Sequence, residues 1–137
     1  MKLSVTSWSF PQCNLNESTG LSNLLGINAI DIGYFYRSAL DKDTLLNDYK
    51  KIINEINKYK IDYANLYHLF GNSLEDRNLA DIKNLEDNKK DLSIVTDFCV
   101  EANIPSIFIL PGVTNPGQSR NDALKSSIES LKSLNEI

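Results

Sequence analysis

The sequence contains few histidines and cysteines and has no excess of positive charge. Its 137 residues hold one histidine, His68, and two cysteines, Cys13 and Cys99, and the net charge is −4 at pH 7. A single histidine excludes a histidine-rich metal cluster, and two cysteines without CxxC spacing do not make a disulfide framework. The acidic balance lacks the basic footprint of nucleic-acid or anionic-membrane binding, so neither partner is expected.

Long apolar runs and glycine-rich signatures are also missing. No stretch of about 18 apolar residues is present, which argues against a transmembrane helix. The opening residues, MKLSVTSWSF, lack the apolar core of a signal peptide, so a cytoplasmic location is predicted. GxGxxG, GxxxxGK[ST] and GxSxG are absent, so the sequence does not indicate a dinucleotide site, a P-loop or a nucleophile elbow.

Four short apolar runs alternate with four helical patterns. The runs cover residues 3–8, 29–34, 62–67 and 106–110, and the helical patterns cover about 15–25, 43–60 and 87–103 and begin again at 119. In the last helix, the expected buried stripe is Leu124, Ile128, Leu131 and Leu134. The βαβαβαβα order predicts an α/β fold with a parallel sheet and right-handed crossovers. The runs at 29–34 and 106–110 are apolar enough to predict helices on both faces of the sheet.

Aromatic and polar residues follow the strands, where ligands of parallel α/β proteins bind. Aromatic rings stack on the C–H faces of sugars, while acids and amides bind their hydroxyls, so a carbohydrate pocket is expected. The candidate substrate-binding residues are Trp8, Asp31, Tyr34, Tyr67, His68 and Gln118; Phe35, Tyr36 and Arg37 lie beside Tyr34.

Each candidate also has a structural interpretation. Tyr34 and Phe70 could cap the core, and Asp31 could make a structural hydrogen bond to a neighbouring strand. His68 could bind a metal, orient a substrate or act as a base, or it could be a satisfied structural histidine. Gln118 precedes a helix start that could hold an anion or could simply be capped. The long connection at 70–86 could form a short helix over the strand ends or could be a solvated loop.

The strand-end segments resemble those of a known family. Trp8-Ser9-Phe10, the passage from Leu25 to Gly33 (LGINAIDIG), the segment from Asn65 to Phe70 (NLYHLF) and the segment from Phe108 to Gly112 (FILPG) are similar to the sugar phosphate isomerase/epimerase superfamily. This superfamily comprises the xylose isomerase-like barrels and includes endonuclease IV-type proteins. The resemblance covers residues 1–137 and corresponds to the amino-terminal half of such a protein.

The resemblance implies a (β/α)8 TIM barrel, of which this chain is a parallel (βα)4 half. It also implies a divalent metal (Mn, Mg, Co or Zn) that polarises a carbonyl and its neighbouring hydroxyl while acids and bases move a proton. His68 is the residue that corresponds to a metal-binding histidine after the third strand of endonuclease-like members. The other ligands of the sugar isomerases belong to later strands, so the isolated chain is expected to be inactive.

Length leaves two alternatives to an isomerase or epimerase. A complete (β/α)8 barrel needs about 250 residues. The chain could therefore be a truncated or split half-barrel that self-associates or pairs with a second half. It could also be a small doubly wound α/β binding module. Strand order 1-2-3-4 favours a barrel segment, and order 2-1-3-4 favours the module.

Overall fold

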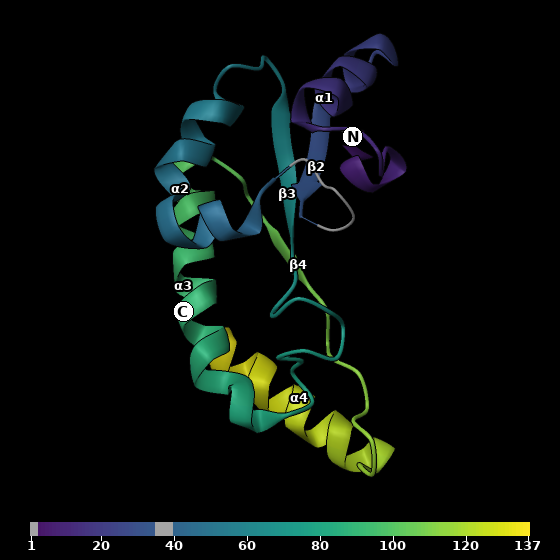
Figure 1. Ribbon diagram of the computed structural model, residues 1–137, viewed down its shortest axis with the longest axis vertical. Helices are drawn as coiled ribbons and strands as arrows, with labels where there is room; N and C mark the ends of the chain where they lie inside the picture. Colours follow the sequence, from purple (N-terminus) through teal and green to yellow (C-terminus); the bar gives the residue numbers. More distant parts are fainter. Residues whose placement is uncertain (1–2, 35–39) are drawn as a thin grey trace. The chain divides into compact units, whose positions relative to one another are not determined.

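A computed structural model describes residues 3–34 and 40–137 of the chain. Strands and α-helices alternate along it, as the sequence predicts (Figure 1). The strands are β1 (Val5–Thr6), β2 (Ala29–Gly33), β3 (Asp62–His68) and β4 (Ile107–Ile109). The helices are α1 (Leu15–Leu24), α2 (Lys42–Ile56), α3 (Leu85–Glu101) and α4 (Arg120–Leu134), with short 3-10 turns at η1 (Ser7–Ser9) and η2 (Ile82–Asn84). The predicted α/β class is confirmed.

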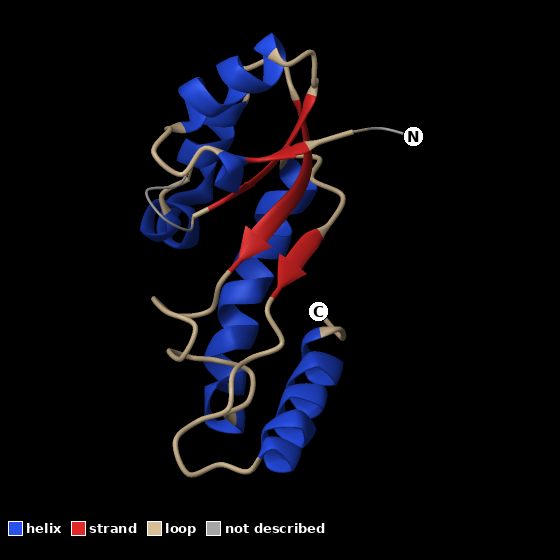
Figure 2. Ribbon diagram, turned by 90° about the vertical axis from the view of Figure 1, so that its right-hand side faces the viewer, coloured by secondary structure: helices blue, strands red, loops and turns tan. Residues whose placement is uncertain are grey.

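The four strands form one parallel sheet in the order β1-β2-β3-β4. Figure 2 shows the arrowheads of β3 and β4 pointing the same way, and Leu66 N donates to Ser106 O at 3.0 Å just before β4. The order is sequential and is not the 2-1-3-4 order of the binding-module alternative. Consecutive βα units that lie side by side in a sheet produce this order.

Contacts divide the chain into two compact units. The first comprises Met1–His68 and Val95–Phe108, and the second comprises Leu69–Ile94 and Ile109–Ile137. The first unit contains β1, β2, β3, most of β4, α1, α2 and the end of α3. The second contains the β3–α3 connection, the beginning of α3, and α4. The candidate site lies in the first unit.

The core of the first unit lies on one face of the sheet. Ile30 and Ile32 of β2 and Leu66 of β3 are fully buried, and they cluster with residues of all three helices of this unit. The helical members are Leu15, Leu45, Ile52, Ile53, Ile56, Val95, Phe98 and Cys99. Because side chains alternate along a strand, Asp31 and Gly33 point to the opposite face. We call that opposite face the inner face.

A β-bulge sets which β3 residues share each face. Ile30 is level with Tyr63, and Ile32 is level with Leu66, so two residues of β2 match three of β3. The irregularity lies between Ile30 and Asp31. Tyr63 and Leu66 therefore both face the helices, and Tyr67, level with Gly33, lies on the inner face.

Three details differ from the predicted elements. The first strand is only Val5–Thr6, because the Thr6 hydroxyl accepts a hydrogen bond from Trp8 N and η1 begins at Ser7. β4 is not buried on both faces, since the side chain of Phe108 is 44% exposed. The predicted stripe of α4 is wrong for Leu124 and Ile128, which are exposed.

The second unit explains the face that α4 buries. The buried residues of α4 are Ala123, Ser127, Ser130 and Leu134. Ser130 Oγ donates to the carbonyl of Leu79 at 3.0 Å, and Leu79 is 1% exposed. Small side chains on this face let the helix approach the β3–α3 connection closely enough for that bond. The face that α4 buries therefore depends on this polar contact rather than on the spacing of its leucine and isoleucine residues.

Candidate functional site

Aromatic rings line the inner face where β1, β3 and β4 end. The Trp8 and Tyr67 rings stack with centroids 4.6 Å apart and an interplanar angle of 25°. Phe108 of β4 meets the other side of this pair, edge-on to Tyr67 at 5.2 Å. Tyr67 is thus the centre of a row of three rings, which we call the aromatic row. Trp8 and Tyr67 are partly exposed, so the row has surface left for a ligand.

Gly33 makes the aromatic row possible. It is level with Tyr67 in the register, and β2 separates β1 from β3. A Cβ at Gly33 would lie 2.9 Å from both the Cβ and the carbonyl oxygen of Tyr67. Any larger residue would therefore displace Tyr67 and separate it from Trp8.

A polar row crosses the same face one step closer to the strand starts. Asp31 is level with Thr6 on β1 and with Asn65 on β3. The Ser4 side chain is hydrogen-bonded to the Asp31 carboxylate, and Ser106 Oγ donates to Asn65 Oδ1 at 2.9 Å. Burial raises the pKa of Asp31 above its ordinary value, and the hydrogen bond from Ser4 partly opposes this shift. The face thus combines rings with a carboxylate, an amide and hydroxyls.

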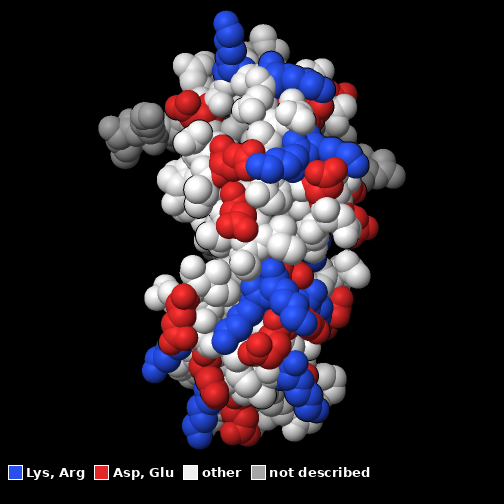
Figure 3. Space-filling model, turned by 90° about the vertical axis from the view of Figure 1, so that its left-hand side faces the viewer, with Lys and Arg blue, Asp and Glu red and all other residues white. Residues whose placement is uncertain are grey.

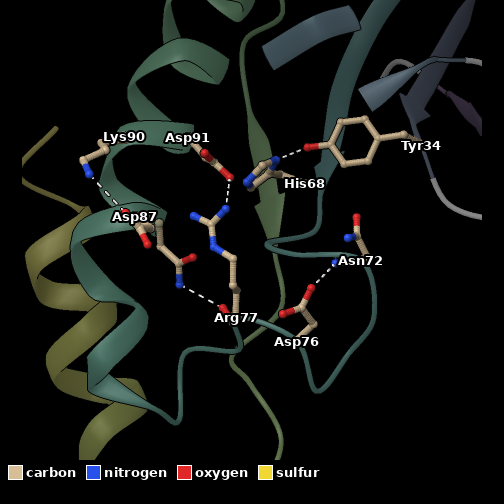
Figure 4. Close-up of polar contacts among 9 residues, drawn as sticks. Tyr34, His68, Asn72, Asp76, Arg77, Asp87, Lys90 and Asp91 are labelled. Atoms are coloured by element: carbon tan, nitrogen blue, oxygen red, sulfur yellow. Dashed lines mark hydrogen bonds and ion pairs between the residues drawn. The ribbon is translucent and has the colours of Figure 1, made fainter. Parts of the chain in front are cut away.

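Tyr34 and His68 lie on the helix-covered side of the sheet. Gly33 and Tyr67 are paired in the sheet register, and Tyr34 and His68 are the residues that follow them in the sequence. Tyr34 packs against the core cluster. The Tyr34 hydroxyl is hydrogen-bonded to Nδ1 of His68, which is fully buried (Figure 4). The two rings meet edge-on with centroids 5.7 Å apart, and the Lys42 ammonium lies 5.6 Å from the centre of the Tyr34 ring. His68 Nδ1 therefore takes part in a buried hydrogen bond that helps to hold the two rings together at the end of the sheet.

The predicted site residues fall into separate groups. Trp8, Asp31 and Tyr67 share the inner face, while Tyr34 and His68 form a pair on the other side of the sheet. Gln118 belongs to the second unit, where its amide nitrogen donates to the Ala80 carbonyl at 2.8 Å and its oxygen accepts from Asn115. These bonds give Gln118 a structural role in the loop before α4. Phe35, Tyr36 and Arg37 lie outside the described residues.

The residues that the sequence analysis did not select are Gly33, Asn65 and Phe108. Asn65 lies two residues before Tyr67 on β3, and Phe108 lies on the neighbouring strand β4. Gly33 follows Asp31 by two positions on β2. A signal was present, because residues two apart on a strand share a face. Applying that rule from Asp31 leads to Gly33, and applying it from Tyr67 leads to Asn65.

The residues present do not fit a divalent metal site. Within residues 3–34 and 40–137, no three His, Cys, Asp or Glu side chains are grouped closely enough to hold one. His68, the candidate ligand, is fully buried and bonded to Tyr34 through Nδ1. No chemical step through a metal follows from these side chains.

Surface charge in Figure 3 is mixed, with lysine and arginine side chains interspersed among acidic ones. Several are paired at helix spacing, such as Lys51 with Asp48 and Lys90 with Asp87. In the described part of the chain, the helices fall short of the length and apolar character needed to cross a bilayer.

No protein-family model matches the chain, and no curated protein matches it significantly.

Proposed function

We propose that the inner face binds a carbohydrate, as the (βα)4 part of a barrel of the sugar phosphate isomerase/epimerase type. The observation that carries this proposal is the Trp8–Tyr67 stack beside the polar row of Asp31 and Asn65. A sugar presents an apolar C–H face and a rim of hydroxyls, and the two rows complement these two features.

The fold supports the barrel part of the proposal. Helices α1 and α2 and the end of α3 cover one face of a parallel sheet with sequential order. In a (β/α)8 barrel the helices form the outer ring, and the other face of the sheet becomes the interior. The aromatic row would then lie at the carboxyl ends of the strands, where ligands of such barrels bind.

Asp31 is the residue that we assign to proton chemistry on the inner face. Its carboxylate has a raised pKa and a hydrogen bond to Ser4, which fixes its position. A base for moving a proton between carbons needs a raised pKa and reach to the substrate. Metal assistance of the kind expected for the family would need ligands from outside the described residues.

The test uses the single tryptophan of the chain, Trp8, as its own reporter. Saturable quenching or a shift of Trp8 fluorescence by aldoses, ketoses or their phosphates is the expected result. Tyr67→Ala should weaken binding, because it removes the ring that stacks on Trp8. Tyr49→Phe is the matched control, since Tyr49 packs against Phe98 in the core. If no sugar in the panel changes Trp8 fluorescence, the proposal fails.

A second candidate function is pairing with another half-barrel. β1 and β4 are the edges of the sheet, and open edges are sites of strand addition. The partly exposed Phe108 lies on the β4 edge. Light scattering at several concentrations tests pairing of two copies of this chain, and a monomer at the highest concentration would exclude it.

A further inference from the structure

Two cross-strand pairs lie next to each other on the part of the inner face that β3 and β4 form. Ser106 Oγ donates to Asn65 Oδ1 at 2.9 Å, and the Phe108 ring meets the Tyr67 ring edge-on with centroids 5.2 Å apart. Because residues two apart on a strand share a face, Ser106 and Phe108 both lie on the inner face. The polar pair and the aromatic pair are about 6.6 Å apart along the strands. We call Asn65, Ser106 and Phe108 the β3–β4 cluster.

The Phe108 ring offers this cluster an apolar surface in a fixed position. Its side chain is 44% exposed, although the edge contact with Tyr67 holds one side of the ring. Figure 2 shows β4 beside β3 and pointing the same way, so the two rings stand on neighbouring strands. An exposed ring that a neighbour already orients loses little side-chain freedom when an apolar ligand face packs on it. The C–H side of a sugar ring is such a face.

The polar pair supplies hydrogen-bonding groups beside this ring. Ser106 Oγ lies 2.9 Å from Asn65 Oδ1 and 3.2 Å from the Ala64 carbonyl oxygen, so its one proton is used within the sheet and its lone pairs remain to accept. Within residues 3–34 and 40–137, no hydrogen bond engages Nδ2 of Asn65, which leaves its N–H groups to a ligand. The pair therefore offers a donor and an acceptor, as two neighbouring hydroxyl groups of a sugar require.

The β3–β4 cluster and Asp31 are too far apart to hold the same sugar ring. Asp31 lies on β2 and Phe108 on β4, so the width of two strand spacings, about 10 Å, separates them across the sheet. A sugar ring centred beside Asp31 therefore leaves Phe108 uncovered, whereas two joined rings reach both. The three side chains of the cluster are uncharged, so they suit a neutral sugar unit better than a phosphorylated one.

We propose that the inner face binds an oligosaccharide, with one sugar unit beside Asp31 and a neutral second unit on the β3–β4 cluster. The second ring lays its C–H face on Phe108, and two of its neighbouring hydroxyls bond to Asn65 Nδ2 and Ser106 Oγ. This inference rests on the proposed carbohydrate binding and names the substrate class of that site. The cluster contributes affinity and selects for length, while the first unit remains at Asp31.

The test compares glucose with two disaccharides of glucose, maltose and cellobiose. Binding to the full chain is followed by Trp8 fluorescence and by amide chemical shifts in NMR. All three sugars should change Trp8 fluorescence, but a disaccharide should also shift the amides of Asn65, Ser106 and Phe108. It should bind about tenfold more tightly than glucose, because the second unit adds a ring contact and two hydrogen bonds.

The outcomes separate this inference from the proposed function. If glucose binds and neither disaccharide binds more tightly or shifts the three amides, the second subsite is overturned and carbohydrate binding stands. If no sugar changes Trp8 fluorescence, both are overturned.

Variants of the cluster test the assignment. Phe108→Ala should remove the tenfold advantage of the disaccharide over glucose, and Val100→Ala, which truncates a 73% exposed apolar side chain on α3, is the matched control. Ser106→Ala removes the acceptor and releases the Asn65 amide, so it should reduce the same advantage, with Ser93→Ala at an exposed position of α3 as its control. Light scattering separates ligand binding from pairing at the β4 edge. A Phe108→Ala chain that changes its oligomeric state but keeps the advantage overturns the proposal.

Discussion

Trp8, in the turn η1 that follows β1, and Tyr67 of β3 stack with their ring centroids 4.6 Å apart, although β1 and β3 are not neighbours in the sheet. The contact passes over β2 at Gly33, which is level with Tyr67. The missing side chain at this one position therefore joins the ends of β1 and β3 into a single aromatic surface. Without that surface, the inner face would carry only its polar row.

Replacing Gly33 with alanine should destabilise the chain and separate the stack. The new Cβ would meet the Tyr67 Cβ and carbonyl oxygen at 2.9 Å, and overpacking of this kind costs about 1–3 kcal/mol. Urea denaturation measures the loss, and the emission of Trp8 reports the change in its surroundings.

Gly20→Ala is the matched control. Gly20 lies within α1, and a Cβ there has no atom within 4 Å. Alanine is the better helix former, so stability should rise by about 0.5–1 kcal/mol. A Gly33→Ala chain as stable as the parent, with unchanged emission, would contradict the proposed role of Gly33.

Replacing Tyr34 with phenylalanine should cost about 1–3 kcal/mol, because it removes a hydrogen-bond partner from the fully buried His68. Tyr59→Phe is the control, since its hydroxyl bonds to Glu55 on the surface of α2 and its loss should have little effect. Urea denaturation of both variants makes the comparison. Equal stability of the two variants would show that the Tyr34–His68 bond contributes nothing.

The side of the sheet on which His68 lies could not be predicted from the sequence. The alternation of strands and helices is visible because apolar spacing differs between them, and this part of the prediction is confirmed. Strict period two from Tyr63 would place Tyr67 on the core side and His68 on the inner face. The bulge in β3 reverses that assignment, and no glycine or proline within Asp62–His68 marks it. One extra residue therefore moved the only histidine away from the proposed sugar surface.

The buried face of α4 was mispredicted for a different reason. Apolar spacing favoured Leu124 and Ile128, yet both are exposed, and Ser130 bonds to Leu79 instead. The spacing of apolar residues predicts which face of a helix is buried, but a specific polar contact with another segment can cause a different face to be buried. That contact depends on the β3–α3 connection, whose conformation has no simple sequence pattern.

Replacing Asp31 with asparagine should make stability less dependent on pH. Burial raises the folded-state pKa of Asp31, so the folded chain holds its proton to a higher pH than the unfolded chain does. Stability from this group is then present below the unfolded pKa, about 3.9, and falls as pH rises through the folded value. Asp31→Asn should therefore be more stable than the parent at pH 7, with the advantage vanishing well below pH 4.

Asp41 provides the control of opposite sign. Its pKa is lowered by hydrogen bonds from Thr44 at the start of α2, so its stabilisation is present at neutral pH and is lost as pH falls. Asp41→Asn should thus be less stable than the parent at pH 7 and equal to it in strong acid. Thermal unfolding from pH 2 to 8 measures both, and parallel curves for the two variants would contradict the assigned shifts.

Removing Asp91 should destabilise the second unit. Arg77 Nη1 donates to Asp91 Oδ2 at 2.8 Å, and both side chains are largely buried, with 27% and 15% exposed. Nε and Nη2 of Arg77 are buried without a hydrogen-bond partner in the described part of the chain, so Asp91 supplies the compensating charge. Asp91→Ala leaves a guanidinium uncompensated and should cost about 1.5–3 kcal/mol.

Asp87→Ala is the natural comparison, because Asp87 pairs with Lys90 on the same helix and both side chains are exposed (Figure 4). Exposed pairs contribute little, so this variant should unfold like the parent. Amide hydrogen exchange distinguishes a local effect from a global one. In Asp91→Ala the amides of Leu79 and Ala80 should exchange faster, since both are buried in the connection that Arg77 helps to fix. Unchanged exchange at these two amides would mean that the ion pair does not hold the connection in place.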